Sequence, residues 1–206
     1  MGQHVGNTAG TKLPIEVLTA DEVERLADQC SRRAPTGIRN RAMIWIMYRC
    51  TMRIAEVLAL EMADWNEERR ELNIRHGKGD KQRLVGVDPM TSEHLRAWIV
   101  ARRERVKGYR RLFCTLAGRP IKQAYIRELL PRLASRAGIE KRVHPHGLRH
   151  SGASELLERG ASLLDLQDQL GHANANVTSK YLHQINPKGR RERISRIWEG
   201  EGTEES

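Results

Sequence analysis

The chain has 206 residues, of which 39% are hydrophobic, and this is enough to bury the core of one ordinary domain. Its 36 Lys and Arg residues outnumber its 26 Asp and Glu residues, giving a formal net charge of +10 at pH 7. Residues 199–206 carry four of the acids and no base, so the rest of the chain is more basic still. This balance indicates a polyanionic partner, with nucleic acid as the first candidate.

The cysteines and the hydropathy pattern exclude several other classes of protein. Cys30, Cys50 and Cys114 lie far apart and form no CxxC pair, so neither a disulfide framework nor a cysteine zinc site is indicated. This usage fits a reducing compartment. No stretch is long and apolar enough to span a membrane, and residues 1–14 lack the apolar core of a signal peptide. We therefore expect a cytoplasmic, nucleoid-associated protein with no membrane partner.

The first fifty residues predict an arm and two helices. Residues 1–14 are polar and Gly-rich and are predicted to be a flexible N-terminal arm. The residues Thr19 to Glu22 read as a capping box, and an apolar stripe that ends at Cys30 follows it. Residues 31–37 are predicted as a loop. From residue 38 to 50, apolar residues would occupy almost every face of a helix, which predicts a central buried helix.

Arg53 is a charged residue between two strongly apolar segments. A charge in such a place is rarely buried without a partner. One explanation is a structural ion pair with Glu56 or Glu61, and the other is a functional group held in a site.

Two short alternating segments, residues 72–75 and 84–87, predict the strands of a hairpin. The turn between them contains glycines and three cations, Lys78, Lys81 and Arg83. A basic hairpin tip is usually only solvated, but it also suits contact with a DNA backbone. We predict DNA contacts from Lys81 and Arg83, and from Arg75 at the end of the first strand.

The remaining chain predicts helices. One begins at Asp88-Pro89, and one spans about residues 121–137, interrupted or bent at Pro131. Further helices are expected at about residues 146–159, 162–170, 177–184 and 190–198. The predicted fold class is mainly α with a small antiparallel β-sheet (α+β).

The stretch from residue 144 to 181 carries the strongest chemical signal. His146 and Arg149 are three apart at the start of a predicted helix, so both side chains leave one face. His172 follows the helix stop at Gly171, and Tyr181 comes nine residues later. A guanidinium among imidazoles suits a phosphodiester, because it grips two phosphate oxygens in a planar fork. A tyrosine beside it could attack that phosphate.

These residues, taken in order, resemble the tyrosine recombinase (phage integrase) family. The matching positions are Arg53 in TMRIAE, Lys78 in GKGDKQR, His146 and Arg149 in HGLRH, His172 in LGH, and Tyr181. The similarity spans about residues 13–184 and implies the family's catalytic-domain fold over residues 15–187. Residues 188–206 would form a C-terminal helix and an acidic tail. Two departures stand out: Thr51 replaces the family's usual glycine, and the chain has no N-terminal helical domain, which is either naturally absent or removed.

The resemblance implies a reaction at a DNA phosphodiester. Tyr181 would attack the phosphorus, forming a 3′-phosphotyrosine and releasing a 5′-hydroxyl. Arg53 and Arg149 would clamp the non-bridging oxygens and stabilise the charge of the transition state. Because one phosphodiester replaces another, the reaction needs no ATP, metal or other cofactor.

The resemblance also assigns the remaining roles and the partners. Lys78 would be the general acid, His146 would assist as a base, and His172 would bind a phosphate oxygen. His150 would support Arg149 or contact DNA. The expected partners are double-stranded DNA and, on paired sites, three further copies in a tetramer, with a monomer in the absence of DNA. The segment 190–198 would dock into a neighbouring copy.

The sequence is also compatible with three other functions. A zinc hydrolase could use His146, His150 and His172, although no nearby carboxylate completes the ligand set. A DNA-binding regulator would need the cations but not Tyr181. A type IB topoisomerase would share the tyrosine chemistry but relax supercoils without pairing two sites.

Overall fold

The structure is a computed structural model that describes residues 16–75 and 82–171. In chain order its elements are α1 (Ala20–Asp28), α2 (Pro35–Arg49), α3 (Ile54–Ala59), the 3₁₀ turn η1 (Met62–Asp64), β1 (Trp65–Asn66), β2 (Glu71–Ile74), β3 (Arg83–Gly86), α4 (Pro89–Arg103), α5 (Gln123–Arg136), α6 (Pro145–Glu158) and α7 (Leu163–Leu170). The predicted fold class, mainly α with a small antiparallel sheet, is confirmed.

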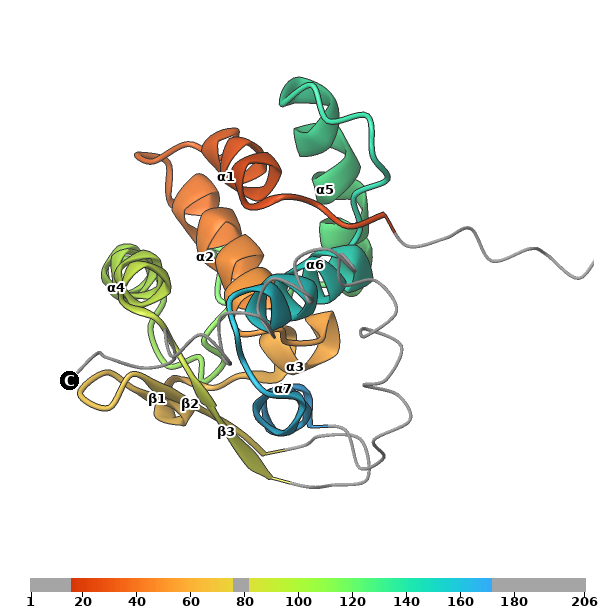
Figure 1. Cartoon of the computed structure of the whole chain (residues 1–206). Helices are drawn as coiled ribbons and strands as arrows, with labels where there is room; N and C mark the ends of the chain where they lie inside the picture. Colours follow the sequence, from red (N-terminus) through yellow and green to blue (C-terminus); the bar gives the residue numbers. More distant parts are fainter. Residues whose placement is uncertain (1–15, 76–81, 172–206) are drawn as a thin grey trace, which may run out of the picture.

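Helix α2 lies at the centre of the molecule, between α4 and α6 (Figure 1). It also contacts α1 and α3, and it is buried on almost every side. The predicted central buried helix is therefore confirmed, but it begins at Pro35 rather than at residue 38. Proline is suited to the first turn of a helix, because its φ is already helical and its missing N–H has no partner to lose there.

The sheet is a three-stranded antiparallel meander in the order β1-β2-β3. Its β2–β3 pair confirms the predicted hairpin, with Leu72 opposite Val85 and Ile74 opposite Arg83. Strand β3 begins one residue earlier than predicted, so Arg83 belongs to the strand and not to the turn. Alternate residues of a strand share a face. Arg83 therefore points to the inner side with buried Val85, whereas Leu84 is exposed.

Helix α6 packs so closely on α2 that the contact requires a glycine. A Cβ atom on Gly152 would lie 1.9 Å from the carbonyl oxygen of Tyr48, closer than any real contact. Only a residue without a side chain fits there. This approach brings the first turns of α6 against the end of α2, where the predicted site residues begin.

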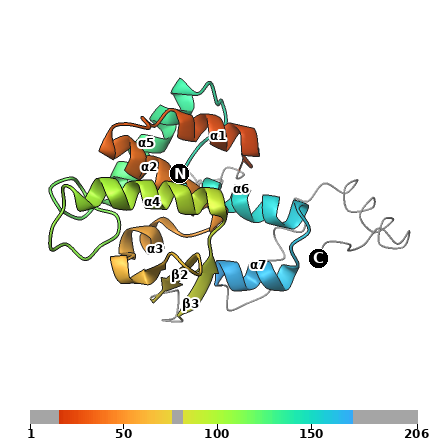
Figure 2. The same cartoon turned by 90° about the vertical axis from the view of Figure 1, so that its left-hand side faces the viewer.

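Helix α7 lies beside α6 and against strand β3 (Figures 1 and 2). Four buried residues, Ala153, Leu157, Leu166 and Leu170, join α6 to α7 in a small apolar cluster of their own. Helix α7 contacts β3 directly, and Arg83 at the start of β3 binds both Gln169 of α7 and Glu56 of α3.

The structure also tests the predicted capping box and the prediction made at Pro131. The capping box of α1 is present, with Thr19 and Glu22 bonding each other's backbone N–H groups at 2.8 and 3.2 Å. Of the two outcomes predicted at Pro131, the interruption is wrong, because α5 continues through this residue. A bend there stays a prediction. The predicted arm and the helices at 177–184 and 190–198 lie outside the described residues. Within residues 16–75 and 82–171, no helix is both long and apolar enough to cross a membrane.

Candidate active site

Arg53 occupies the N-cap of α3, where its own sequence neighbours hold it. Glu56, three residues on, accepts a hydrogen bond from the Arg53 backbone N–H at 2.8 Å. The other carboxylate oxygen accepts a 2.8 Å bond from Nη1 of Arg53. A glutamate three residues after the N-cap commonly satisfies the N-cap N–H, so this arrangement follows from local sequence. The ion pair with Glu56 that the sequence allowed is present, and Arg53 keeps 32% of its side chain exposed.

Thr51 adopts the left-handed backbone conformation, with φ of 47°. This conformation strains a β-branched residue, whereas glycine takes it freely. The position is the one where the resemblance led us to expect a glycine, so threonine keeps the turn at a cost in strain. The turn aims the Thr51 carbonyl at α6, where it accepts a 2.5 Å hydrogen bond from Nη1 of Arg149.

Arg149 lies in the second turn of α6 and is almost completely buried, with 2% of its side chain exposed. Its Nη2 donates to the carbonyl oxygen of Leu170, the last residue of α7, at 3.0 Å. Its Nη1 lies 3.7 Å from a carboxylate oxygen of Glu56. Arg149 thus joins three segments that are far apart in the sequence: the turn before α3, the start of α6 and the end of α7.

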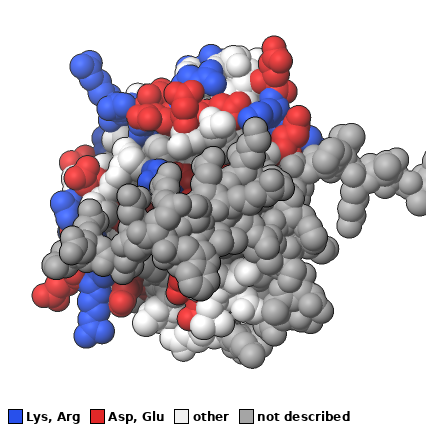
Figure 3. All heavy atoms as spheres, in the orientation of Figure 1, with Lys and Arg blue, Asp and Glu red and all other residues white. Residues whose placement is uncertain are grey.

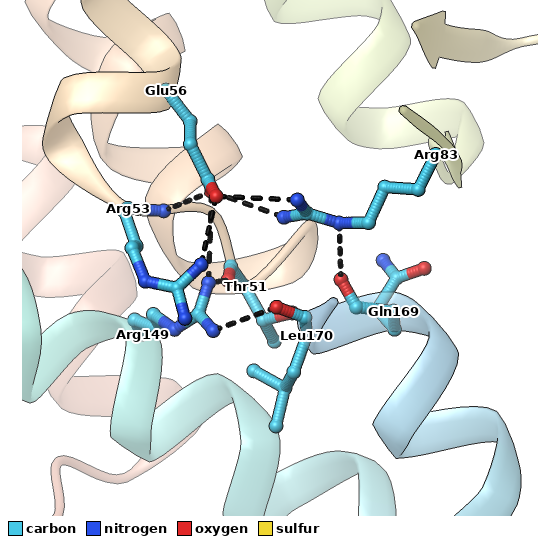
Figure 4. A network of polar contacts seen from close by, with 7 residues as sticks. All are labelled: Thr51, Arg53, Glu56, Arg83, Arg149, Gln169 and Leu170. Atoms are coloured by element: carbon cyan, nitrogen blue, oxygen red, sulfur yellow. Dashed lines mark hydrogen bonds and ion pairs between the residues drawn. The ribbon is translucent and has the colours of Figure 1, made fainter. Parts of the chain in front are cut away.

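Arg53 and Arg149 therefore converge on the same carboxylate, that of Glu56 (Figure 4). Arg83 reaches it from strand β3 and donates to both of its oxygens, at 3.2 and 3.0 Å. The Glu56 side chain is 4% exposed. Burial alone would raise the pKa of Glu56, but the hydrogen bonds from Arg83 and from the Arg53 backbone, with the charges of Arg83 and Arg149, lower it overall. Glu56 is therefore ionised at neutral pH.

Three guanidiniums around one carboxylate leave an excess of positive charge in a partly closed site. We call Arg53, Glu56, Arg83 and Arg149 the Glu56 cluster. The face seen in Figure 3 carries basic and acidic side chains together, with acidic ones over α1. A buried excess of this sign favours an anionic ligand.

His146 stands at the start of α6, beside the Glu56 cluster. Its ring centre lies 6.4 Å from those of both His144 and His150. Its partial removal from water lowers the pKa of His146, and the charges of Arg149 and Arg53 lower it further. The imidazole is therefore neutral at pH 7 and able to accept a proton.

A cleft of about 820 Å³ opens beside His146. Its wall includes Ile54, the residue after Arg53, three cations, Arg127, Lys141 and Arg142, and one acid, Glu140. Lys141 is paired with Glu22 at 2.7 Å, so Arg127 and Arg142 supply most of the positive charge of the cleft.

Two residues predicted to contact DNA, Arg83 and His150, face protein groups within the site, and their contact with DNA stays a prediction. Arg83 has 11% of its side chain exposed and binds Glu56. His150 is 6% exposed, and burial followed by the charges of His146 and His144 lowers its pKa to about 4. A neutral, buried imidazole suits the supporting role beside Arg149 that was the other expectation. Arg75 keeps 42% of its side chain exposed, although its Nε binds Asp64 at 2.5 Å.

Four predicted residues, Lys78, Lys81, His172 and Tyr181, lie outside the described residues. Among those that are described, the sequence reasoning missed Arg83 as a member of the cluster. The signal was available, because Arg83 stands two residues before the inward-facing Val85 in an alternating strand.

The model of the phage integrase family matches residues 16–186. Among curated proteins, the chain is 32% identical over 183 residues to tyrosine recombinase XerD of Halalkalibacterium halodurans, covering 87% of this chain and 61% of that protein. It is 38% identical over 175 residues to tyrosine recombinase XerC of Xanthomonas campestris pv. campestris, covering 85% of this chain and 53% of the relative. The chain thus spans little more than half the length of these curated relatives.

Solved structures share the fold. The XerA recombinase superposes with a TM-score of 0.78 at 28% identity, covering 91% of this chain and 66% of the other. The XerH recombinase bound to a palindromic difH substrate after cleavage has a TM-score of 0.75 at 30% identity, and the match covers 94% of this chain and 56% of the other. The catalytic domain of bacteriophage HP1 integrase, at 22% identity and a TM-score of 0.62, matches in fold over 95% of its length. The fold is that of a tyrosine recombinase catalytic domain, as predicted.

Proposed function

Because this chain belongs to the phage integrase family, we propose that it is a site-specific DNA recombinase, which cleaves and rejoins strands through a 3′-phosphotyrosine intermediate. The observation that carries the proposal is the Glu56 cluster. Arg53 and Arg149, from distant parts of the chain, converge on one carboxylate and leave positive charge in excess. A phosphodiester is an anion that two guanidiniums can grip by its non-bridging oxygens.

The proposed nucleophile is Tyr181. A free tyrosine has a pKa of about 10, so its ionisation at pH 7 costs about 4 kcal/mol. The positive cluster supports the reaction by stabilising both the phenolate and the additional charge on the phosphoryl oxygens in the transition state. His146, neutral at pH 7, is the proposed acceptor of the phenol proton. Lys78 is the proposed donor to the leaving 5′ oxygen, and His172 the proposed ligand of a phosphate oxygen.

The wider assignments are part of the same proposal. Residues 15–187 form the catalytic domain, in agreement with the 16–186 span of the family match. The partner is double-stranded DNA, contacted by Arg75 and Lys81, and four copies assemble on paired sites through residues 188–206. The protein works on the nucleoid in the cytoplasm. The relative XerH is solved in complex with a DNA substrate, which supports the choice of partner.

A trapping experiment tests the reaction. The protein is incubated with a library of nicked DNA duplexes of randomised sequence, in which the nick lets the cleaved end diffuse away and prevents rejoining. We expect a covalent protein–DNA adduct whose attachment maps to Tyr181 and whose yield is unchanged by excess EDTA. Tyr181→Phe should bind the recovered duplex as the parent does and form no adduct. Adduct formation by the Tyr181→Phe protein would refute the assignment, and loss of the parent's adduct in EDTA would favour a metal hydrolase.

The pH dependence of the same reaction tests His146. Because the pKa of His146 is lowered from its ordinary value of 6.5, the midpoint of the acid decline in cleavage rate should lie below pH 6.5. The decline reflects protonation of the imidazole, which removes its capacity to accept the phenol proton. In His146→Gln the rate should be lower throughout and this decline should be lost; a decline that persists in the variant would assign it to another group.

A further inference from the structure

We propose that Arg83 is a positioning residue of this site, which holds the Glu56 carboxylate and thereby keeps Arg53 and Arg149 available to the phosphate. This inference rests on the proposed function. It concerns a residue that the sequence had placed on the DNA-contacting hairpin and that the structure places inside the Glu56 cluster.

The contact between Arg83 and Glu56 is bidentate. Nη1 and Nη2 of Arg83 donate to separate carboxylate oxygens, at 3.2 and 3.0 Å. Both groups are largely removed from water, with 11% and 4% of their side chains exposed. A bidentate guanidinium–carboxylate pair has a fixed geometry that a lysine cannot reproduce. Arg83 therefore sets both the charge and the orientation of Glu56.

Arg83 also binds the end of α7. Its Nε donates to the carbonyl oxygen of Gln169 at 3.3 Å, next to the Leu170 carbonyl that Arg149 binds at 3.0 Å. The last carbonyls of a helix lack partners within it and form the negative end of its dipole, so they attract cations. A Cβ on Gly171 would lie 2.8 Å from Nη1 of Arg83, so a glycine there leaves room for the guanidinium. Arg83 thus joins β3 to α3 and α7 (Figure 4).

Without Arg83, the buried carboxylate would turn to its remaining cations. A buried charge that loses a partner is strongly unfavourable and draws on the nearest opposite charge. Arg53 already binds Glu56 at 2.8 Å, and Arg149 is only 3.7 Å away. These are the two groups proposed to grip the phosphate. Glu56 would then compete with the substrate for them, and the positive excess in the cluster would fall from two charges to one.

Arg83 is not proposed as a phosphate ligand itself. Its two terminal nitrogens both donate to the Glu56 carboxylate and its Nε donates to Gln169. The terminal nitrogens of Arg149 donate instead to the neutral carbonyls of Thr51 and Leu170, which compete less strongly with an anionic ligand. The action of Arg83 is through Glu56, and this makes a specific prediction. Removing the carboxylate together with Arg83 should restore the excess of two charges and return part of the activity.

The experiment compares Arg83→Gln with the double variant Arg83→Gln, Glu56→Gln, using the duplex recovered from the randomised nicked library. At saturating DNA, Arg83→Gln should form adduct about 10- to 100-fold more slowly than the parent, while its affinity for the duplex changes by less than about 3-fold. The double variant should be at least about 5-fold faster than Arg83→Gln, because the competing charge is gone. Arg96→Gln, which breaks an exposed Arg–Glu pair between α4 and Glu67, is the matched control and should react like the parent.

The outcomes separate this inference from the proposed function. A parent protein that forms no adduct refutes the recombinase proposal and the role of Arg83 with it. A reactive parent with an equally reactive Arg83→Gln, or a double variant no faster than Arg83→Gln, refutes the inference alone. Adduct is normalised to the folded fraction measured by circular dichroism. If Arg83→Gln does not fold, Arg83→Lys alone and with Glu56→Gln give the same comparison, because lysine keeps the charge but loses the fork.

Discussion

The arginines at the start of α2 and those of the Glu56 cluster are held in different ways. At the start of α2, Arg39 donates to neutral oxygens, those of Cys114, Asn40 and Tyr125, at 3.0 to 3.3 Å. Its neighbour Arg41 pairs with Asp28 at 2.6 Å, and that carboxylate is 41% exposed to water. In the Glu56 cluster, by contrast, three guanidiniums share one carboxylate that is 4% exposed.

The difference shows that burial of an arginine does not by itself mark a functional site. Arg39 ties α2 to α5 and to the segment before α5 through neutral oxygens, which is a structural role. Glu56 is a single acid among three cations, and the cluster stands beside His146, which lines a cleft together with Arg127 and Arg142. The excess of charge, more than the burial, predicts an anionic ligand there.

The largest expected effect tests directly whether the two groups of arginines have different roles. Arg149→Gln should lower the rate of adduct formation by about 10²- to 10³-fold, because it removes one of the two donors to the developing charge. Arg39→Gln should lower the free energy of unfolding by about 2 kcal/mol, because several buried hydrogen bonds to a charged group are lost. Adduct formation per folded molecule should be unchanged in Arg39→Gln, measured with the same nicked duplex. A rate loss in Arg39→Gln as large as in Arg149→Gln would remove the distinction between the two regions.

The next prediction concerns the contact that brings Arg149 to Thr51. Gly152→Ala places a Cβ 1.9 Å from the Tyr48 carbonyl oxygen, so α6 and α2 must separate. We expect a loss of about 2–3 kcal/mol in the free energy of unfolding. Gly86→Ala is the matched control, because a Cβ there meets nothing within 4 Å. Urea unfolding of both variants measures the difference, and similar midpoints would show that the helices yield without cost.

A smaller effect is expected in the acid range of the stability profile. The folded state lowers the pKa of Glu56 from its ordinary value of 4.5. Its contribution is therefore present above that pH and is lost as the pH falls through the lower, folded-state pKa. Glu56→Gln should make the decline of unfolding free energy shallower as the pH falls below about 4.5. The substitution should not abolish the acid decline in unfolding free energy, because the pKa values of Glu22 and Asp28 are also lowered in the folded state. An unchanged slope would mean that Glu56 is held no differently from an exposed acid.

The smallest effect belongs to an exposed pair. Arg96 binds Glu67 at 2.7 Å, but both side chains are more than half exposed. Arg96→Gln should change the free energy of unfolding by less than about 1 kcal/mol, and salt should reduce even that. Thermal unfolding at low and high salt measures it. A loss comparable to that of Arg39→Gln would show that the surface pairs matter as much as the buried ones.

The sequence alone determined the features that depend on neighbouring residues. The capping box at Thr19, the Glu56 bond to the Arg53 backbone and the β2–β3 hairpin each follow from residues a few positions apart. The order of the family motifs was equally visible, and it carried the fold class and the candidate site.

Only the tertiary structure decided which groups share the site. From the sequence, Arg83 and His150 were predicted only as DNA contacts or supporting groups; the fold turns Arg83 toward Glu56 on the inner face of β3 and buries His150 in the packing of α6. Thr51 was an irregular position in the sequence, and the fold shows it in a left-handed turn whose carbonyl binds Arg149. The physical reason is how far apart in the sequence the interacting residues lie. Local hydrogen bonds depend on spacing along the chain, whereas the Glu56 cluster exists only where three distant segments pack together.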